Sequence, residues 1–428
     1  MAYHCRMDPS SALTLAFAFF LVASLVVKFW LASRQVRHVA RHRDAVPPPF
    51  DGIVSLPAHQ KAADYTIAKG RLGLLETAFS AAVLLAWTLL GGLHALNQFL
   101  VERLGTGMWQ QLALLASVSV IGGVLDLPFS LYQTFVIEQR FGFNKMTWKL
   151  WLSDFLKSAL LGAALGLPLA WVILWLMHAA GAQWWIWAWG VTSLFLLFVQ
   201  FIFPIFIAPL FNKFEPLQDE ALKERITRLM QRCGFVAKGF FIMDGSKRSA
   251  HANAYFTGFG ASKRVVFYDT LIARLSPEEV DAVLAHELGH FRLKHIAKRI
   301  ALTYVMSFVA FALLGWLSRQ VWFYTGLGVA PNLEGPNDAL ALVLFMLATP
   351  VFTFFISPVM AQFSRKHEFE ADAFAVTQTS GLHLGSALLK LYEDNASTLT
   401  PDPVFVKFYY SHPPATERLA RLQLEGAT

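Results

Sequence analysis

Residues 286–321 read HELGHFRLKHIAKRIALTYVMSFVAFALLGWLSRQV and join a polar motif to a long apolar run. It opens with two histidines, His286 and His290, on either side of a glutamate and two further residues. From Ile300 to Val321 the side chains are mostly apolar. At about 1.5 Å per helical residue, such a segment crosses the roughly 30 Å of hydrocarbon in a bilayer. A polar helix therefore leads directly into a predicted membrane span.

The composition of the whole chain agrees with a membrane location. Its 428 residues are 55% hydrophobic and 15% charged, which is too apolar for one ordinary soluble core. The formal charge of +7 could suit a nucleic acid, but basic residues in so apolar a chain usually gather in cytoplasmic loops. We therefore expect the lipid bilayer as a partner and no nucleic acid.

Six further apolar runs are long enough to cross a bilayer, which makes seven predicted spans. The first could be a cleaved signal peptide, but it is long and is followed by basic residues, so we interpret it as a retained helix. The seven spans are residues 12–31, 72–93, 109–132, 151–178, 184–210, 300–321 and 339–362.

The distribution of Lys and Arg predicts the orientation in the membrane. The connection after the first span carries seven basic residues between Arg34 and Arg71, and the one between spans six and seven carries none. The basic connections should be cytoplasmic, and both polar regions then lie on that side. The predicted organisation is residues 1–210 with spans one to five, a polar region at 211–299, residues 300–362 with spans six and seven, and a second polar region at 363–428.

The first polar region should contain a small β-sheet and the helix that carries the opening motif. Residues 240–244, 254–257 and 264–268 have the composition of short strands. Ser276, Pro277 and Glu279 then offer an N-cap, a proline at the first helical position and a glutamate three residues after the cap. The motif helix should therefore begin there.

On a helix the opening motif has the geometry of a metal site. His286 and His290 lie about 40° apart on one face, and Glu287 lies on the same side. The two imidazoles can bind one Zn²⁺, whose open position lowers the pKa of a bound water toward about 7, while Glu287 accepts the proton of that water. The alternative is a helix that reads H-E-x-x-H by chance, and such matches are rare enough that we favour the metal site.

A zinc site of this kind needs a third protein ligand. The longer pattern with a third histidine on the same helix would place Gly at position 293 and His at 296, where this chain has Leu293 and Ile296. His295 is out of register with that pattern and lies among basic residues. We interpret it as a solvated or headgroup-facing residue.

The better source of a third ligand is the segment SRKHEFEADAFA, residues 364–375, after the seventh span. Glu368 and Asp372 are four residues apart and share a helical face, whereas Glu370 points about 160° away from Asp372. Glu368 would bind the metal, and Asp372 would accept the ring N–H of a ligand histidine. Without the opening motif, a solvated acidic helix end would be the simpler interpretation.

Several motifs together resemble one family. The chain contains HELGH, SRKHEFEADAFA, DGSKRSAHANAYFTGF at 244–259, YYSHPP at 409–414, NKFEPL at 212–217 and DLPFSLYQTFVIEQRFGFN at 126–144. Together, and with both halves of the metal site in order along the chain, they resemble the M48 zinc metallopeptidases, specifically the Ste24 or CAAX prenyl protease type, over most of the chain. The shorter HtpX-type relatives share the zinc motifs but resemble this chain less.

The resemblance implies a fold and further site residues. The expected fold is a mainly α-helical, polytopic membrane protein, in which seven helices enclose a chamber below a cytoplasmic zincin-like metallopeptidase domain with a small β-sheet. One zinc ion per chain would be held by His286, His290 and Glu368. Asn253 and Ala254 resemble the edge strand on which an extended substrate pairs, and His412 resembles a donor to the developing oxyanion. Outside the family, the first two would be ordinary strand residues and His412 a turn residue.

The expected function is therefore zinc-dependent cleavage of peptide bonds, in peptide or protein substrates that are membrane-associated or lipidated. The alternatives are an HtpX-like quality-control protease and a non-proteolytic scaffold with a structural metal. Glu287 favours an enzyme, because a structural site has no use for a carboxylate beside an open metal position.

The chain carries no KDEL-type retention signal. We expect a bacterial cytoplasmic membrane, with the endoplasmic reticulum as the alternative.

Overall fold

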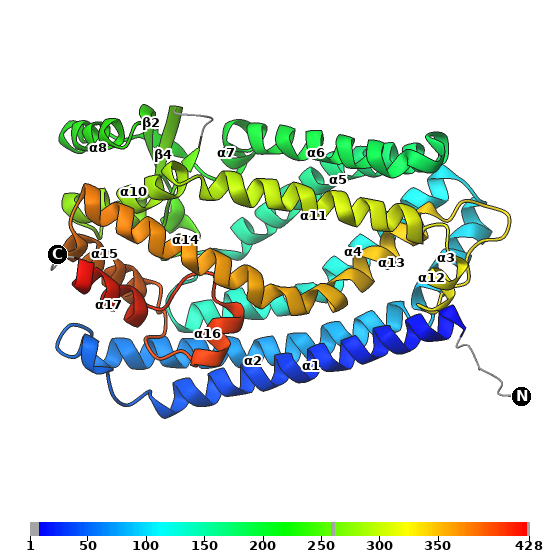
Figure 1. Ribbon diagram of the computed structural model, residues 1–428, viewed down its shortest axis with the longest axis horizontal. Coiled ribbons are helices and arrows are strands. Elements are labelled where there is room, and N and C mark those ends of the chain that lie inside the picture. The colour runs from blue at the N-terminus through cyan, green and yellow to red at the C-terminus, as the bar shows by residue number, and fades with distance from the viewer. Residues whose placement is uncertain (1–7, 258–261, 426–428) are drawn as a thin grey trace, which may run out of the picture.

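The computed structural model describes residues 8–257 and 262–425; residues 426–428, where a retention signal would stand, lie outside this part (Figure 1). Within it, seven helices are long and apolar enough to cross a membrane, which confirms the predicted number of spans. They are α1 Pro9–Arg41, α2 Leu56–Trp87, α4 Met108–Tyr132, α5 Trp148–Ala179, α6 Trp184–Ile202, α11 His295–Leu317 and α13 Asp338–Thr353. A π-helical turn Gln133–Glu138 extends α4, a second one Phe203–Ile207 joins α6 to α7 Ala208–Phe211, and the 3-10 turn Phe354–Ile356 joins α13 to α14 Ser357–Gln378.

The first two helices are longer than the predicted spans. The 33 residues of α1 extend over roughly 50 Å, well beyond the roughly 30 Å of hydrocarbon. Beyond its apolar part, Arg34 contacts Asp402 at 3.0 Å. An apolar run indicates only the part of a helix that contacts lipid. The predicted spans were therefore shorter than the helices. The prediction was also wrong at the end of span two, because Gly91, with φ +78°, separates α2 from α3 Gly92–Leu104.

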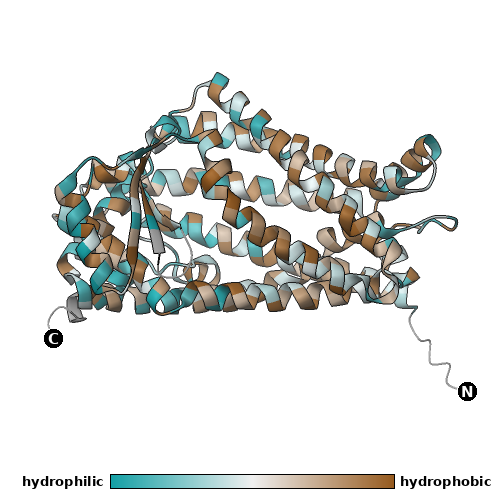
Figure 2. Cartoon of the chain, turned by 90° about the horizontal axis from the view of Figure 1, so that it is seen from above, coloured by the Kyte–Doolittle hydropathy of each residue, from teal (hydrophilic) through white to brown (hydrophobic). Residues whose placement is uncertain are grey.

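Polar and apolar residues separate along the length of the molecule. Figure 2 shows hydrophilic residues gathered at the end that holds the sheet and the C-terminus, and hydrophobic residues along the long helices. Large apolar side chains on these helices are exposed, among them Trp187, Leu194 and Phe206 at 62%, 68% and 65%. Such continuous apolar exposure is typical of a surface that faces lipid.

The polar end combines both predicted polar regions. It contains α8 Glu220–Arg232, α9 Asp269–Ile272, α10 Pro277–Arg292, α15 Gly381–Asp394, α16 Pro403–Tyr409 and α17 Ala415–Glu425, together with the short strand β1 Phe214–Pro216. One hydrophobic core runs through α8, α9, α10, α15 and α17 and includes Ile226, Phe267, Leu284 and Leu419. Residues before α11 and residues after α13 therefore pack into one body.

The sheet contains the three predicted strands and one that was missed. Its order is β1, β2 Val236–Met243, β4 Ser262–Tyr268 and β3 Ala254–Thr257. β2 and β4 are parallel, while β1 and β3 pair with them antiparallel. β1 was not predicted because it has three residues, one of them a proline, and is stabilised only by its pairing with β2. Within the described residues β3 forms an edge of the sheet.

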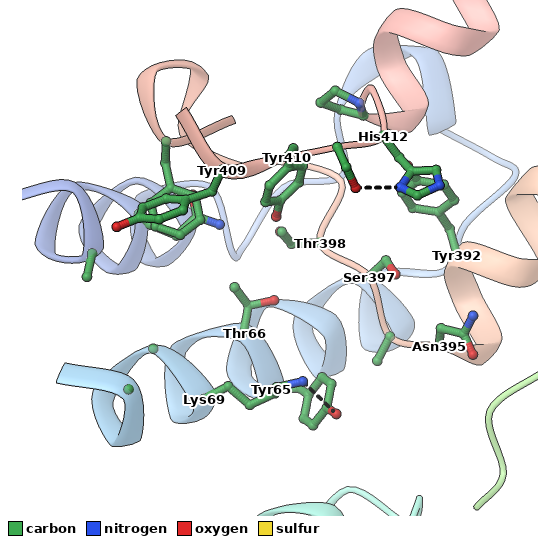
Figure 3. Close-up of a pocket in the computed structure, with 18 of the residues that line it drawn as sticks. Tyr65, Thr66, Lys69, Tyr392, Asn395, Ser397, Thr398, Tyr409, Tyr410 and His412 are labelled. Atoms are coloured by element: carbon green, nitrogen blue, oxygen red, sulfur yellow. Dashed lines mark hydrogen bonds between the residues drawn. The ribbon is translucent and has the colours of Figure 1, made fainter. Parts of the chain in front are cut away.

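A large cavity lies where α1 and α2 meet the polar end. Its volume is about 810 Å³, and its lining includes Gln35, Tyr65, Lys69 and His412. Figure 3 shows Tyr65, Thr66 and Lys69 of α2 on one side of it, and Tyr410 and His412 on the other. A second cavity of about 440 Å³ shares Lys28, Gly73 and Thr77 with the first and continues between α1, α2 and α13. The two cavities adjoin each other and lie between the membrane helices and the polar end, where the chamber was expected.

Candidate active site

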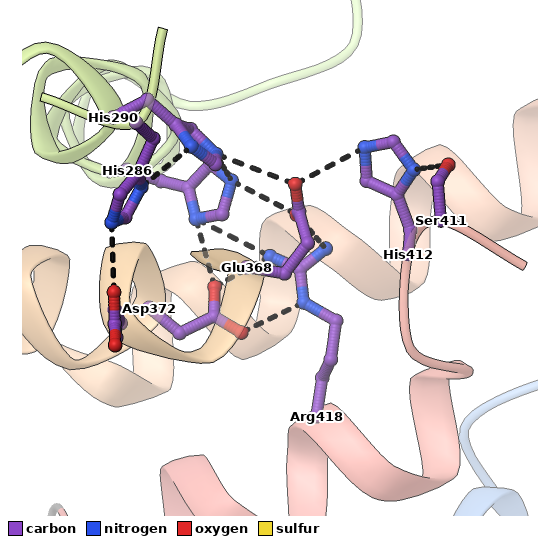
Figure 4. Close-up of polar contacts among 9 residues, drawn as sticks. His286, His290, Glu368, Asp372, Ser411, His412 and Arg418 are labelled. Carbon is purple, nitrogen blue, oxygen red and sulfur yellow. Dashed lines mark hydrogen bonds and ion pairs between the residues drawn. The ribbon is translucent and has the colours of Figure 1, made fainter. Parts of the chain in front are cut away.

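Two helices bring three potential metal ligands together. His286 and His290 of α10 have their Nε2 atoms 3.2 Å apart. Glu368 of α14 places Oε2 3.4 Å from Nε2 of His286 and Oε1 3.4 Å from Nε2 of His290. Figure 4 shows the three side chains pointing toward one another. The structure thus joins the two polar regions at the residues that the sequence singled out.

The arrangement of these three groups fits a zinc ion. Ligands about 2.0–2.1 Å from a tetrahedral zinc are separated by roughly 3.3–3.4 Å, close to the spacing of these donors. Oε2 of Glu368, the oxygen that faces His286, is buried and has no hydrogen-bond partner apart from this contact within the described residues. Two imidazole nitrogens and a carboxylate oxygen with no hydrogen-bond donor beyond the rings themselves form a site that a cation completes.

Local sequence explains why α10 and α14 meet here. The predicted capping box is confirmed, because Ser276 and Glu279 hydrogen-bond each other's backbone and fix the start of α10. Glu279 also contacts Ser386 and Lys390 of α15 at 2.6 and 2.7 Å. At Gly289, a side-chain carbon would stand 3.2 Å from the Cα of Ala371 in α14. The glycine of HELGH therefore lets the two ligand-bearing helices approach closely.

Asp372 and Arg418 lie behind His286. The Nδ1 atom of His286 is 2.8 Å from Asp372, on the side of the ring away from the cluster. Burial alone would lower the pKa of His286, but hydrogen bonds to Asp372 and Glu368 outweigh it and raise that pKa to about 9. The carboxylates that stabilise the positive charge of a protonated imidazole would also stabilise a metal cation bound to the neutral ring.

Arg418 was missed by the sequence analysis. Its guanidinium binds both oxygens of Asp372, at 2.5 and 2.8 Å, and it is 5% exposed. A signal was available in α17, where Ala415, Leu419 and Leu422 form the buried face of the helix and Arg418 lies among them. A charged residue on an apolar face requires a buried partner, although the sequence does not say which one.

Glu287 and His412 line one cleft with the three ligands. This cleft has a volume of about 230 Å³. Within the described part of the chain, the carboxylate of Glu287 has no hydrogen-bond or ion-pair partner, and it does not belong to the group of three donors. His412 places Nε2 3.3 Å from Glu368, and its Nδ1 is 2.9 Å from the hydroxyl of Ser411. Ser411 and His412 also line the large cavity, so the cleft and the cavity share a wall.

The structure does not bring Asn253 and Ala254 into the lining of this cleft. Both lie at the start of the edge strand β3, where the side-chain oxygen of Asn253 accepts from the N–H of Ala254 at 2.8 Å. The strand nevertheless runs close to the metal helix, because the rings of Phe256 and Phe291 lie 5.8 Å apart and Phe291 follows His290.

The interpretation of His295 as a solvated residue was wrong. It is 3% exposed, and its Nδ1 lies 3.1 Å from Nδ1 of His290. Its Nε2 lies 2.8 Å from Glu370, the carboxylate expected to point away from the metal. The reason is Lys294, whose left-handed backbone, with φ +58°, ends α10 and turns the chain into α11. The angles of one continuous helix therefore did not apply beyond residue 293.

Comparisons with known proteins agree with this geometry. Residues 35–213 match the family model described as CAAX prenyl protease N-terminal, five membrane helices, and residues 216–425 match Peptidase family M48. The CAAX prenyl protease 1 homologue of Oryza sativa is 35% identical, over 94% of this chain and 96% of its own. CAAX prenyl protease 1 of Saccharomyces cerevisiae is 33% identical, over 94% and 93%.

A solved structure extends the likeness to three dimensions. The crystal structure of S. mikatae Ste24p matches with a TM-score of 0.88 and 31% identity, over 96% of this chain and 99% of that one. Fold and site together define an integral, multi-pass membrane metalloendopeptidase. The chain belongs to peptidase family M48, in the group that includes the CAAX prenyl proteases named above.

Proposed function

We propose that this protein cleaves peptide bonds near the C-termini of membrane-associated or lipidated CAAX-type substrates, with one zinc ion held by His286, His290 and Glu368. The observation that carries the proposal is the single cleft in which these three donors converge beside the unpaired carboxylate of Glu287. The names of the relatives support the class of substrate. A scaffold with a structural metal would have no need of such a carboxylate.

The residues of the cleft divide the chemistry among them. A zinc ion held by His286, His290 and Glu368 would polarise the scissile carbonyl and lower the pKa of a bound water. Glu287 accepts on a carboxylate oxygen the proton released when water adds to the carbonyl carbon, and it transfers this proton to the leaving amine nitrogen. When the hydroxyl of Ser411 donates to Nδ1 of His412, Nε2 of that ring keeps its hydrogen and can donate to the carbonyl oxygen as negative charge develops there.

Two features suit a substrate that ends near the cleft. Arg299 of α11 lines the cleft, and its guanidinium has no ion-pair partner within residues 8–257 and 262–425. A free C-terminal carboxylate is the substrate group that such a cation attracts. The adjoining cavity of about 810 Å³ offers room for the preceding residues and their lipid. An extended peptide would add to the edge strand at Asn253 and Ala254.

We also propose that the polar end faces the cytosol. The basic connections that follow spans one and three lie at that end, as the contacts Arg34 to Asp402 and Asn144 to Ser249 indicate. Positive loops are retained on the cytoplasmic side of a membrane. The same orientation holds for a bacterial cytoplasmic membrane and for the endoplasmic reticulum, and in both the substrate C-terminus would be reached from the cytosol.

The decisive variant is Glu287→Gln, which keeps the size of the side chain but cannot accept the proton of water. We expect normal zinc content and a loss of about 10²–10⁴ in turnover of a lipidated peptide substrate. Zinc content by metal analysis and cleavage by mass spectrometry should be measured on the same preparation. Cleavage at the wild-type rate by the zinc-loaded variant would contradict the role of Glu287, and unaltered cellular function of a cleavage-dead variant would favour the scaffold.

A further inference from the structure

A chain of three side chains leads from the metal cluster to the protein surface. Nδ1 of His290 lies 3.1 Å from Nδ1 of His295, and Nε2 of His295 lies 2.8 Å from Oε2 of Glu370. The three residues come from α10, α11 and α14. His295 is 3% exposed, so water does not compete for its ring nitrogens.

Glu370, at the outer end of this series of hydrogen bonds, determines which ring nitrogens of His295 and His290 donate and which accept. An ionised carboxylate accepts hydrogen bonds only, so Glu370 requires a hydrogen on Nε2 of His295. Neutral His295 then has a lone pair on Nδ1, which requires a hydrogen on Nδ1 of His290. His290 is left with its lone pair on Nε2, the atom that faces His286 and Glu368.

We propose that Glu370 and His295 are positioning residues, which fix the tautomer and the ring orientation that His290 needs to bind the metal. The inference rests on the proposed function, because it takes His290 as a ligand. The other ligand histidine has the same arrangement in a shorter form, since Asp372 contacts Nδ1 of His286 directly at 2.8 Å. In each case a carboxylate sets the proton on the nitrogen opposite the ligand atom.

The left-handed residue between α10 and α11 makes this contact possible. On an uninterrupted helix, a residue five positions after His290 would point about 140° away from it. Lys294 breaks the helix with φ +58°, and His295 packs back against His290. The end of the metal helix and the beginning of the membrane span therefore meet at the hydrogen bond between these two rings.

The same residues could be taken for a second metal site, because His295, His367 and Glu370 have ligand atoms within 4.8 Å of one another. The geometry of the rings opposes this reading. His295 and His367 are stacked with their centroids 4.1 Å apart and their planes 11° from parallel. A metal ion lies close to the plane of each imidazole that binds it, and two stacked planes cannot both contain one ion. His367 instead supports the ring of His295 by stacking.

Two substitutions at His295 separate the hydrogen bond from packing. The amide oxygen of His295→Asn can replace Nδ1 as an acceptor for His290. His295→Phe keeps a ring against His367 but offers no acceptor. We expect His295→Phe to bind zinc about 10–100-fold more weakly than the wild type, and His295→Asn to recover most of that loss. His367→Phe, which removes a histidine that contacts no ligand, is the matched control and should bind zinc as the wild type does.

Zinc affinity should be measured by competition with a chromophoric chelator, with thermal unfolding of the metal-free proteins to confirm that each variant is folded. In ¹⁵N-histidine NMR of the wild type, Nδ1 of His290 should carry the hydrogen. Wild-type affinity in His295→Phe, or equal losses in the Phe and Asn variants, would overturn the inference. Two zinc ions per chain, falling to one in His367→Phe, would replace it by a second metal site.

The same measurements keep this inference distinct from the proposed function. His290→Ala should abolish zinc binding if His290 is a ligand, whatever the role of His295. Normal zinc binding by His290→Ala would contradict the proposed site itself. Zinc loss in His290→Ala together with unchanged affinity in His295→Phe would contradict the positioning role alone.

Discussion

The buried ion pair between Asp372 and Arg418 has two roles that experiment can separate. Asp372 accepts a hydrogen bond from His286 and also neutralises Arg418, which is 5% exposed. Asp372→Ala should therefore weaken zinc binding by about 10–100-fold. It should also destabilise the fold by roughly 3–5 kcal/mol, because it leaves a buried guanidinium without its partner.

The double variant Asp372→Ala/Arg418→Met removes the unpaired charge together with the carboxylate. We expect it to recover most of the lost stability, because Met fills similar volume without a charge, but not the zinc affinity. Thermal unfolding and chelator competition measure the two quantities independently. Recovery of zinc affinity in the double variant would show that Asp372 acts on the site only through Arg418.

The candidate metal site shows which residues a sequence can reveal. His286, Glu287 and His290 were predicted because their relation depends only on the period of one helix, and Glu368 because its segment has the same period and the family motif. His295 could not be placed, because a single left-handed residue at Lys294 changes the direction of the chain. Arg418 could be recognised as anomalous, but its partner depends on how α17 packs.

At the scale of elements, the contact between α10 and α14 sets the distance between the three proposed ligands. A side-chain carbon on Gly289 would stand 3.1 Å from the ring of Phe374 and 3.2 Å from the Cα of Ala371. Alanine normally stabilises a helix by about 1 kcal/mol relative to glycine. Here the backbone of α14 must instead move by a few tenths of an ångström, and Glu368 moves with it.

We therefore expect Gly289→Ala to fold but to bind zinc about 10-fold more weakly, since second-sphere displacements of this size disturb ligand geometry. Gly123→Ala in α4 is the matched control, because a side-chain carbon there would meet nothing within 4 Å. Chelator competition on both variants provides the measurement. Equal zinc affinity in Gly289→Ala and the wild type would show that the helices can adjust without moving Glu368.

The sheet was predictable except at its shortest strand. Three strands follow from apolar and β-branched runs between turn residues, and all three are confirmed. The order of the strands was not predicted, because it depends on the parallel crossover that places β4 between β2 and β3. Among the residues that the structure describes, that order makes β3 an edge, which is the requirement for pairing with an extended substrate.

At the scale of the whole molecule, the cleft and the two cavities adjoin one another between the membrane helices and the three proposed ligands. The cleft shares Ser411 and His412 with the larger cavity, which shares Lys28 with the cavity between α1, α2 and α13. A lipidated C-terminus entering through these cavities would carry its free carboxylate into the cleft. Arg299 is the cation that lines the cleft there without an ion-pair partner in the described residues.

We expect the enzyme to prefer a substrate peptide with a free C-terminal carboxylate over its amide by about 10–100-fold in kcat/KM, the range of a hydrogen bond to a charged group. Arg299→Gln should abolish this preference. Lys298→Gln, the adjacent positive residue that does not line the cleft, should retain it. Measuring kcat/KM on both peptides with the wild type and with each variant tests the role of Arg299 in recognising the carboxylate. A preference that survives in Arg299→Gln would assign recognition of the carboxylate to another group.

The two halves of the metal cluster lie far apart in the order of synthesis. His286 and His290 precede α11 and α13, and Glu368 and Arg418 follow them. A nascent chain therefore exposes its paired histidines while the third donor is still untranslated, and these halves can meet only after both intervening helices have been inserted in opposite directions. If these three donors hold the metal, a chain stalled on the ribosome before Glu368 would lack the third of them and would remain without a complete site.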